Sequence, residues 1–280
     1  MPKNIIKLCT FNILAPSWAS FTHYPESAFS LLDINKRRPK ILETIINLAK
    51  DCDIVALQET QEDEIHYYNK LMNEIGFEGV HVNHDDSYWE KSITSDRPFV
   101  SNGVAMYWRT STIKIDKIHL PILSEGGNKC IVLHAKKGGK KIRIACVHLD
   151  SDYGGRRKSE AKNLMNILTH NSEITDIVIG DLNFDADNKP YKKTFGKHKF
   201  KNVLKVVGKE EKTHPYINGY LGNSRYVIID HILVRNGTPL DGKVVNFNVW
   251  DDGKTTEERV NLLLERSGSD HFPVIGIINF

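Results

Sequence analysis

Polar residues follow several apolar, strand-like segments of this chain, and this arrangement constrains the fold more than any other feature. Asn12 follows IIKLCTF, Glu59 follows DIVALQ and His148 follows IRIACV. Asp181 and Asn183 follow DIVIG in the same way. Runs of Val, Ile and Leu indicate strands buried on both faces, so polar residues at their ends lie on the rim of a sheet. Open sheets hold ligands at such rims, and the sequence therefore predicts one assembled site there.

Two further polar positions belong to the same pattern. Asp230 interrupts the strand-like segment YVIIDHILV, and Asp270 and His271 open the final segment DHFPVIGIINF. A buried aspartate is costly unless it is paired. A pair between Asp230 and His271 would remove that cost, and an acid on an edge strand facing water is the alternative.

The spacing of apolar residues predicts four helices, at 38–50, 62–75, 158–169 and 256–266, with Pro39 in the first turn of the first one. Strands are predicted at 5–11, 54–57, 103–108, 113–119, 131–135, 141–147, 177–179, 226–234, 244–249 and 274–278. The KKGGK segment at 136–140 predicts a hairpin turn, and the Lys-rich segment 189–212 predicts a loop or insert. This mixture predicts a strand-rich, layered α/β domain, and without a composition shift we expect residues 1–280 to form one domain.

Charge and cysteine content exclude few partners. The net charge of +3 neither requires nor excludes a nucleic acid. The four cysteines form no C-x-x-C pair, so we expect reduced thiols and no zinc site.

The first strand starts too early for a signal peptide, and no apolar stretch is long enough to span a bilayer. We expect an intracellular monomer, in the cytoplasm or the nucleus.

The carboxylates of this pattern suit a hard metal ion. Glu59 and Asp270, with Asp181 and Asn183 nearby, offer oxygen ligands for Mg²⁺ or Mn²⁺. Asp181 and Asn183 are two residues apart, so in extended backbone both face one way. The carboxylate can then orient or deprotonate a water, and the amide can donate to a phosphoryl oxygen. The alternatives are a helix-capping role for Glu59 and a simple turn at GDLN.

A basic segment follows His148. The sequence GGRRK contains Arg156 and Arg157 at the expected start of a helix. Arginines and free N–H groups at a helix start can bind phosphate, so both arginines are candidate substrate-binding residues. The alternative is a solvated helix start, with His148 in a structural role.

Together these motifs resemble the endonuclease/exonuclease/phosphatase superfamily, whose fold is shared by DNase I and exonuclease III. The resemblance spans nearly the whole chain in order: FN at 11–12, LQE at 57–59, NGVAMYW at 102–108, VHL at 147–149, GDLN at 180–183, IDHIL at 229–233 and SDHFPV at 269–274. It implies a four-layered α/β sandwich, in which two mixed, mostly antiparallel sheets face each other with helices on the outside. It also implies a metal-dependent phosphoric ester hydrolase.

The resemblance assigns a role to each matching position. Glu59 would bind Mg²⁺, Asn12 would sit beside that metal, and Asp270 would support it or a second metal. Asp181 would position or activate the attacking water. His148 and Asn183 would contact phosphoryl oxygens, and His271, paired with Asp230, would contact the scissile phosphate.

The branch of the family is less defined. FNILAPSWAS and RRPKILETI resemble the deadenylase and nocturnin branch, in which Thr213-His214 falls at a polar-aromatic segment, so His214 is a candidate substrate-binding residue. VHLDSDYGGRRK instead resembles the 5′-tyrosyl-DNA phosphodiesterases. We expect a Mg²⁺-dependent nuclease, with an exonuclease on single-stranded RNA 3′ ends slightly favoured. The alternatives are DNA-end processing, including abasic endonuclease activity, and a phosphoinositide phosphatase or sphingomyelinase.

Substrate contacts outside these motifs are expected from the loops. Trp18, Tyr88, Trp89 and His214 are candidates to stack on a base, and packing is the alternative for each. The predicted helix at 256–266 precedes the SDH motif, where it could wall the site.

Overall fold

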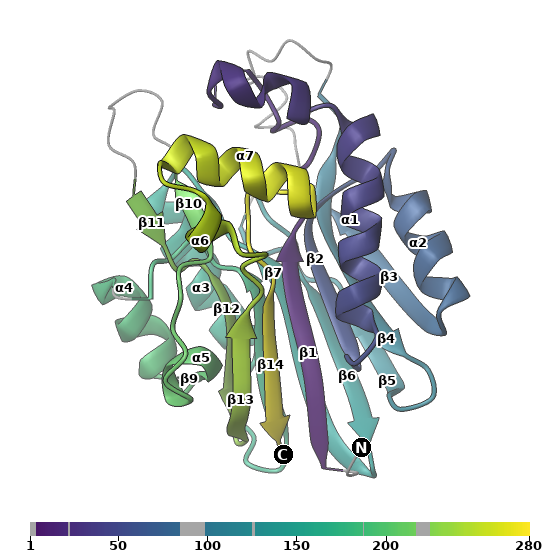
Figure 1. Ribbon diagram of the computed structural model, residues 1–280. Helices are drawn as coiled ribbons and strands as arrows, with labels where there is room; N and C mark the ends of the chain where they lie inside the picture. The colour runs from purple at the N-terminus through teal and green to yellow at the C-terminus, as the bar shows by residue number, and fades with distance from the viewer. Residues whose placement is uncertain (1–3, 22, 85–98, 125–126, 187, 217–224) are drawn as a thin grey trace.

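Two six-stranded sheets face each other, and helices lie on their outer sides (Figure 1). The computed structural model describes residues 4–21, 23–84, 99–124, 127–186, 188–216 and 225–280. The first sheet runs in the order β13 (Thr238–Val244), β14 (Val274–Asn279), β1 (Ile5–Asn12), β2 (Ile54–Gln61), β4 (Asn102–Arg109) and β3 (Phe77–Asn83). The second runs in the order β5 (Lys114–His119), β6 (Ile131–Lys137), β7 (Lys140–His148), β8 (Thr175–Asp181), β12 (Asp230–Arg235) and β9 (Lys201–Asn202).

Both sheets are mixed and mostly antiparallel. Among the described strands, β1 pairs with β2 and β7 with β8 in parallel, and the other pairs are antiparallel. β10 (His214–Tyr216) and β11 (Arg225–Val227) form a separate two-stranded sheet. The helical segments are η1 (Glu26–Leu31), α1 (Ile34–Ala49), α2 (Ile65–Glu74), α3 (Gly154–Ile167), α4 (Lys189–Tyr191), η2 (Lys192–Gly196), α5 (Val203–Val206), α6 (Val249–Asp252) and α7 (Thr256–Ser267). This is the four-layered α/β sandwich predicted from the sequence.

Alternation along the strands divides the core into layers. In β1, Ile6 and Leu8 belong to the cluster between the two sheets. Cys9 and Phe11 belong instead to the outer cluster, with side chains of α1 and α2. Successive side chains of a strand point to opposite faces, so a strand buried on both sides is apolar throughout. The continuous apolar runs of the sequence therefore reflect a sheet covered on both faces.

The first helix begins earlier than predicted. α1 starts at Ile34, because Asp33 caps it by accepting a hydrogen bond from the Asn35 N–H. Pro39 consequently lies inside the helix and not in its first turn. The prediction of residue 38 as the start is wrong because an Asp cap outweighs the preference of proline for a first turn.

Three other segments differ from the expected elements. The strand predicted at 244–249 is wrong: β13 ends at Val244 and Val249 already begins α6. The strand predicted at 226–234 is split into β11 and β12. The Lys-rich segment 189–212 is not only a loop, since α4, η2, β9 and α5 lie in it and bury Phe195 and Val203. The hairpin at 136–140 is confirmed, with Gly138 and Gly139 at positive φ.

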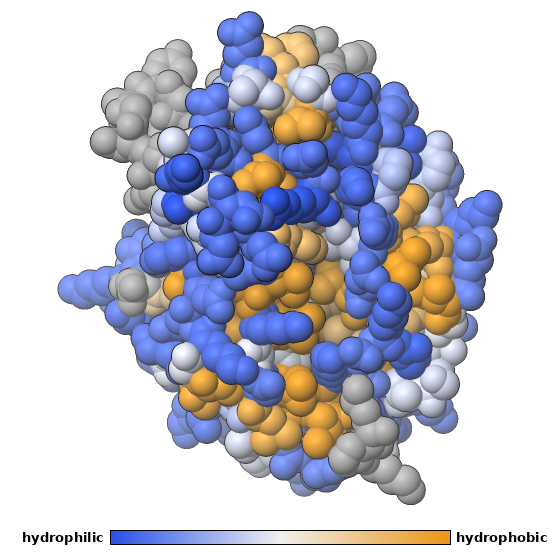
Figure 2. Space-filling model, in the orientation of Figure 1, coloured by the Kyte–Doolittle hydropathy of each residue, from blue (hydrophilic) through white to orange (hydrophobic). Residues whose placement is uncertain are grey.

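α7 crosses one end of the sandwich, and both chain ends lie at the opposite end (Figure 1). The C-terminal end of β1, where Asn12 lies, points toward α7. Figure 2 shows hydrophobic surface over the lower centre of this face, in the region of β13 and β14, where Leu240 is exposed. Among the described residues, no helix is both long enough and apolar enough to cross a membrane.

Candidate active site

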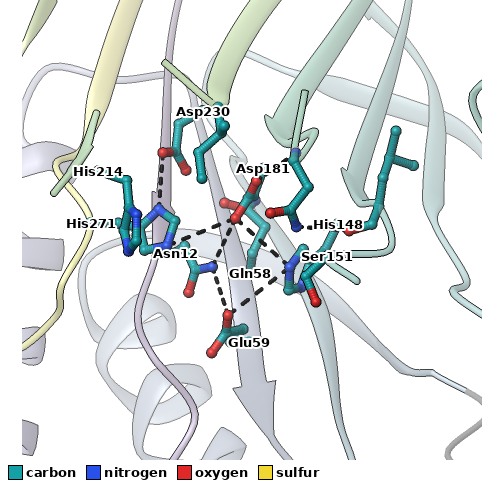
Figure 3. A network of polar contacts seen from close by, with 12 residues as sticks. Asn12, Gln58, Glu59, His148, Ser151, Asp181, His214, Asp230 and His271 are labelled. Carbon is teal, nitrogen blue, oxygen red and sulfur yellow. Dashed lines mark hydrogen bonds and ion pairs between the residues drawn. The ribbon is translucent and has the colours of Figure 1, made fainter. Parts of the chain in front are cut away.

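The predicted strand-end residues meet at one place, and the strand pairing explains why. His148 at the end of β7 is paired with Asp181 at the end of β8, and Asp181 is paired with Asp230 at the start of β12. Asn12 comes from the other sheet, where it ends β1. Its Nδ2 lies 3.2 Å from Asp181 Oδ2, so one hydrogen bond joins the two sheets (Figure 3).

Glu59 leaves its strand through a β-bulge. The pairing of β2 with β4 shifts between Gln58 and Thr60, and Glu59 has φ of 59°. Positive φ is unfavourable for a residue with a side chain, and such strain is concentrated at functional sites. The Glu59 carboxylate is fixed on both oxygens, because Oε1 accepts from Asn12 Nδ2 at 2.8 Å and Oε2 from the Ala15 N–H at 2.9 Å. The bulge thus aims a preorganised carboxylate at the centre of the site.

Asp181 is that centre. Its Oδ1 accepts from the Asn183 N–H at 2.8 Å, and its Oδ2 lies 3.7 Å from His148 Nε2 and 3.9 Å from His271 Nε2. The last two distances are too long for hydrogen bonds. They leave Asp181 Oδ2 beside two imidazole nitrogens. A carboxylate in this position can orient a water molecule beside a bound phosphate.

His271 and Asp230 form the predicted pair. His271 Nδ1 and Asp230 Oδ2 are 2.9 Å apart, and both residues are buried. Burial disfavours the charged ring most strongly, but the charge and hydrogen bond of Asp230 outweigh it and raise the pKa of His271 to about 10. His271 is therefore a cation at neutral pH. The alternative of Asp230 as a water-facing edge acid is wrong.

Thr213 positions this pair and was not identified as a site residue from the sequence. Its hydroxyl accepts from the backbone N–H groups of Ile229 and Asp230, at 3.0 and 3.1 Å. Its carbonyl accepts from the Phe272 N–H at 2.8 Å. One buried threonine thus holds the backbone beside both members of the pair.

Asp270 is a second buried carboxylate of the site. Its Oδ2 accepts from the Tyr24 hydroxyl at 2.8 Å and lies 3.2 Å from His214 Nε2. Burial alone would raise the pKa of Asp270, but His214, His271 and Tyr24 hold it well below its usual range. Asp270 Oδ1 has no hydrogen-bond partner among the described residues. Tyr24 could not be found from the sequence, since its segment carries no motif.

The donor atoms fit a hard divalent cation. Asp181, Asp230 and His271 bring ligand atoms within 4.8 Å of one another, as do His214, Asp270 and His271. Glu59 is in neither group. Both groups depend on His271, which is protonated and cannot donate a lone pair. Asp270 Oδ1, which is buried and has no partner in the described part of the chain, and the lone pairs left on Glu59 are therefore the better oxygen donors for a divalent cation. Asn12 Oδ1 accepts from the Leu14 N–H, which fixes the amide that donates to Glu59.

His148 and Asn183 lie where the sequence predicted. His148 Nε2 is 4.0 Å from Glu59 Oε1, and its buried Nδ1 has no hydrogen-bond partner in the described part of the chain. Asn183 has φ of 50° and donates through Nδ2 to the Leu149 carbonyl at 2.8 Å. Its amide retains a second N–H for a ligand.

The two arginines make protein contacts. Arg157 donates to the carbonyls of Asp150 and Ser151, and Arg156 lies 3.3 Å from Asp150 Oδ2. Neither arginine is among the described residues that line the cavity. Of the stacking candidates, Trp18 and His214 line the cavity, whereas Tyr88 and Trp89 lie outside the described residues.

A cavity of about 300 Å³ lies above these residues. Small-molecule sites usually span roughly 300–1,000 Å³, so this one suits a compact group. Val260 of α7 lines it, so the predicted wall formed by this helix is confirmed. Its described lining residues are Leu14, Trp18, His23, Tyr24, Glu59, His84, Asn102, Asn128, His148, Leu149, Asp150, Ser151, Asp152, Asp181, Asn183, His214, Pro215, Ile229, Val260, Asp270 and His271.

The fold and site define a metal-dependent phosphoester hydrolase. Residues 9–271 match the Endonuclease/Exonuclease/phosphatase family, and the chain belongs to this family. No curated protein sequence matches it significantly.

Solved structures share its fold. ANGEL2, a 2′,3′-cyclic phosphatase, is 14% identical with a TM-score of 0.71, over 98% of this chain and 95% of that one. The human nocturnin catalytic domain is 19% identical with a TM-score of 0.70, over 99% and 94%. TDP2 from D. rerio, with a single-strand DNA product, is 15% identical with a TM-score of 0.66, over 99% of each chain.

Proposed function

We propose that this chain uses Mg²⁺, with Mn²⁺ as a possible substitute, to hydrolyse a phosphodiester bond of a nucleic acid or nucleotide. Exonuclease activity on single-stranded RNA 3′ ends is the favoured form. The observation that carries the proposal is the convergence of Asn12, Glu59, Asp181, Asp230 and His271 within one hydrogen-bonded and ion-paired network (Figure 3). It joins metal ligands, a base and a cation around one small cavity.

The roles follow from the geometry. A divalent cation held by Glu59 and Asp270 would supply positive charge toward the phosphoryl group. Asp181 Oδ2 would orient the attacking water and accept its proton, since Asn12 fixes this carboxylate. His271, held as a cation by Asp230, would donate to a phosphoryl oxygen and stabilise its added negative charge. His148 and the free N–H of Asn183 would contact the other phosphoryl oxygens.

The size of the cavity supports the end of a single-stranded nucleic acid as the substrate. Its compact volume, with Val260 and Tyr24 among the lining residues, suits a single unpaired nucleotide unit. DNA-end processing is the second candidate. The VHL segment leading into α3 favours it, and the D. rerio TDP2 structure of similar fold carries a single-strand DNA product.

A panel of substrates tests this proposal. Labelled single-stranded RNA, single-stranded and duplex DNA, an abasic duplex, a 5′-tyrosyl oligonucleotide and a phosphoinositide would be incubated with Mg²⁺ or with EDTA. We expect RNA to shorten from its 3′ end in the presence of Mg²⁺ alone. Failure to cleave any phosphodiester would overturn the proposed function, and selective cleavage of the tyrosyl oligonucleotide would favour the second candidate.

A further inference from the structure

A group of neutral polar side chains lines the cavity beside His148, and none of them was given a role in the site from the sequence. His84 follows the end of β3, Asn102 begins β4, and Asn128 lies in the loop before β6. All three line the cavity and are buried, with exposures of 7%, 2% and 8%. Nothing in the proposed chemistry uses them.

Hydrogen bonds fix the backbone of these residues and the ring of His84. The His84 N–H donates to the Asn102 carbonyl at 2.9 Å, and the Asn128 carbonyl accepts from the Leu123 N–H at 2.8 Å. The Lys129 N–H donates to His84 Nδ1 at 3.1 Å. Residues at the ends of two neighbouring strands of the first sheet and in the loop before β6 thus form one connected wall. Such preorganisation is what a binding subsite requires.

The imidazole of His84 has a defined hydrogen-bonding direction. Because Nδ1 accepts from Lys129, the neutral ring carries its proton on Nε2. Burial, with smaller effects of His148, His81 and Lys129, keeps the pKa of His84 well below its usual value, so the ring stays neutral. Its buried Nε2 has no partner among the described residues. A buried donor without an acceptor is costly, and a ligand atom in the cavity would satisfy it.

The charge of the lining favours an uncharged ligand group. Five carboxylates line the cavity, from Glu59, Asp150, Asp152, Asp181 and Asp270, and no lysine or arginine is among the described lining residues. A second phosphate would meet repulsion that His84 and two amides could not offset. Hydroxyl groups both donate and accept, and they match an imidazole N–H beside two amides.

The distance of these three residues from the proposed phosphate position determines which part of a substrate they contact. The rings of His84 and His148 are 6.0 Å apart, and His148 Nε2 faces Asp181 Oδ2 at 3.7 Å. The subsite is therefore one side chain away from the proposed phosphate position. In a nucleotide, the group bonded directly to the phosphate is the sugar.

We propose that His84, Asn102 and Asn128 form a neutral subsite that binds the hydroxyl groups of the sugar attached to the scissile phosphate. This inference rests on the proposed phosphodiester hydrolysis and extends it, since it makes the 2′-hydroxyl of a ribonucleotide a positive determinant. The same chemistry would accept a hydroxylated hexose phosphate.

The first test compares a ribodinucleotide with the matched deoxyribodinucleotide, using the metal-loaded full chain. A polar site rejects a substrate that lacks its hydrogen-bonding group, so we expect kcat/KM to favour the ribo form by about tenfold or more. His84→Phe, which keeps a ring but no donor, should reduce this ratio about tenfold. His84→Gln, which keeps an N–H at a similar reach, should retain most of it. His119→Phe, at an exposed position of β5, is the control and should keep the wild-type ratio.

The second test distinguishes the sources of the sugar by calorimetry. AMP, 2′-deoxy-AMP and mannose 6-phosphate would be titrated into the metal-loaded protein and into His84→Phe. Tighter binding of AMP than of 2′-deoxy-AMP, lost in His84→Phe, supports the subsite with ribose. Binding of mannose 6-phosphate that His84→Phe weakens and His84→Gln preserves supports it with a hexose. If the affinity of none of the three ligands changes in His84→Phe, and AMP binds no more tightly than 2′-deoxy-AMP, the proposed subsite is wrong.

The two proposals fail in different ways. Hydrolysis without any ribo preference, together with ligand binding that does not depend on His84, would overturn the subsite and leave the proposed function standing. If the protein hydrolyses no phosphodiester, the proposed function is wrong, and the calorimetry still decides whether the subsite binds a hydroxylated sugar.

Discussion

Asp230 Oδ2 and His271 Nδ1 lie 2.9 Å apart, and this contact joins the start of β12 in one sheet to the loop before β14 in the other. It converts two residues that would each be costly to bury into a charged pair. The pair fixes the ring of His271 and keeps it protonated beside Asp181.

Replacing Asp230 with Asn should release the proton of His271. Its pKa, raised to about 10 in the wild type, should fall, since burial lowers it, Asp230 makes the largest contributions that raise it, and Asp270 and Asp181 raise it less. Wild-type activity should then persist from pH 7 to 9, whereas that of Asp230→Asn should fall with rising pH at a lower pH than in the wild type, as the lowered pKa of His271 is passed. We expect kcat/KM at pH 7.5 to drop about 100-fold.

The imidazole titration can be followed by NMR alongside the pH–rate profiles. Asp241→Asn, an exposed acid on β13, is the control. Unchanged titration of His271 in Asp230→Asn would show that another group holds its charge.

Arg37 should be a large contributor to stability. Its guanidinium is buried, and Nη1 donates to the carbonyls of Ile13, Leu14 and Gly268, which flank Asn12 and the SDH segment. Arg37→Met leaves these carbonyls without a partner, so we expect a loss of about 3 kcal/mol or more in the free energy of unfolding.

Urea denaturation measures this loss. Lys40→Met, also on α1, removes an exposed pair with Glu43 and should cost about 1 kcal/mol or less. An equal cost for the two variants would contradict the role assigned to Arg37.

Acid should destabilise the fold partly through His231. This buried ring has Nδ1 3.0 Å from Asn202 Nδ2 and Nε2 2.9 Å from the Phe184 carbonyl, which fits the neutral form. Burial lowers its pKa in the folded state. Its contribution is therefore complete above the unfolded value of about 6.5 and is lost as pH falls through the folded value, by up to about 1.4 kcal/mol per pH unit.

Unfolding free energies at pH 7 and 5 test this contribution. His231→Gln should show a smaller decrease than the wild type, and the exposed His170→Gln should show the wild-type decrease. An equal decrease in the free energy of unfolding for wild type and His231→Gln would refute the contribution of His231.

Gly180 should tolerate no side chain, because it places Asp181. It has φ of 139°, and an added Cβ would collide with the Val147 carbonyl oxygen. We expect Gly180→Ala to cost about 3 kcal/mol or more in thermal or urea unfolding. Gly155→Ala, at an open position in α3, should be neutral or slightly stabilising. A mild effect at Gly180 would mean that the end of β8 can shift.

Much of the site could be predicted because it depends on strand ends. A polar residue after an apolar run is visible in the sequence, and pairing such as His148 with Asp181 follows once the strands are neighbours. Asp230 was expected to pair with His271 because burial of either alone is costly. The bulge at Glu59 and the positive φ of Asn183 have no comparable signal.

The remainder depends on contacts between distant segments. Tyr24 and Thr213 enter the site through loops, and the ring of His84 is held by a hydrogen bond from the loop before β6. The strand predicted at 244–249 failed because its apolar residues serve a turn and α6 instead. The local sequence pattern does not show whether these apolar residues will pack from a strand, a turn or a helix.

The most direct test of the central claim is the metal dependence of wild type and Glu59→Gln. Phosphodiester hydrolysis and Mn²⁺ binding would be measured for both proteins and for Glu62→Gln, an exposed neighbouring acid, as control. We predict metal-dependent hydrolysis, abolished by EDTA, in the wild type and the control, and at least about 100-fold weaker hydrolysis with weakened Mn²⁺ binding in Glu59→Gln. Undiminished hydrolysis by Glu59→Gln, or by the wild type in EDTA, would contradict the account.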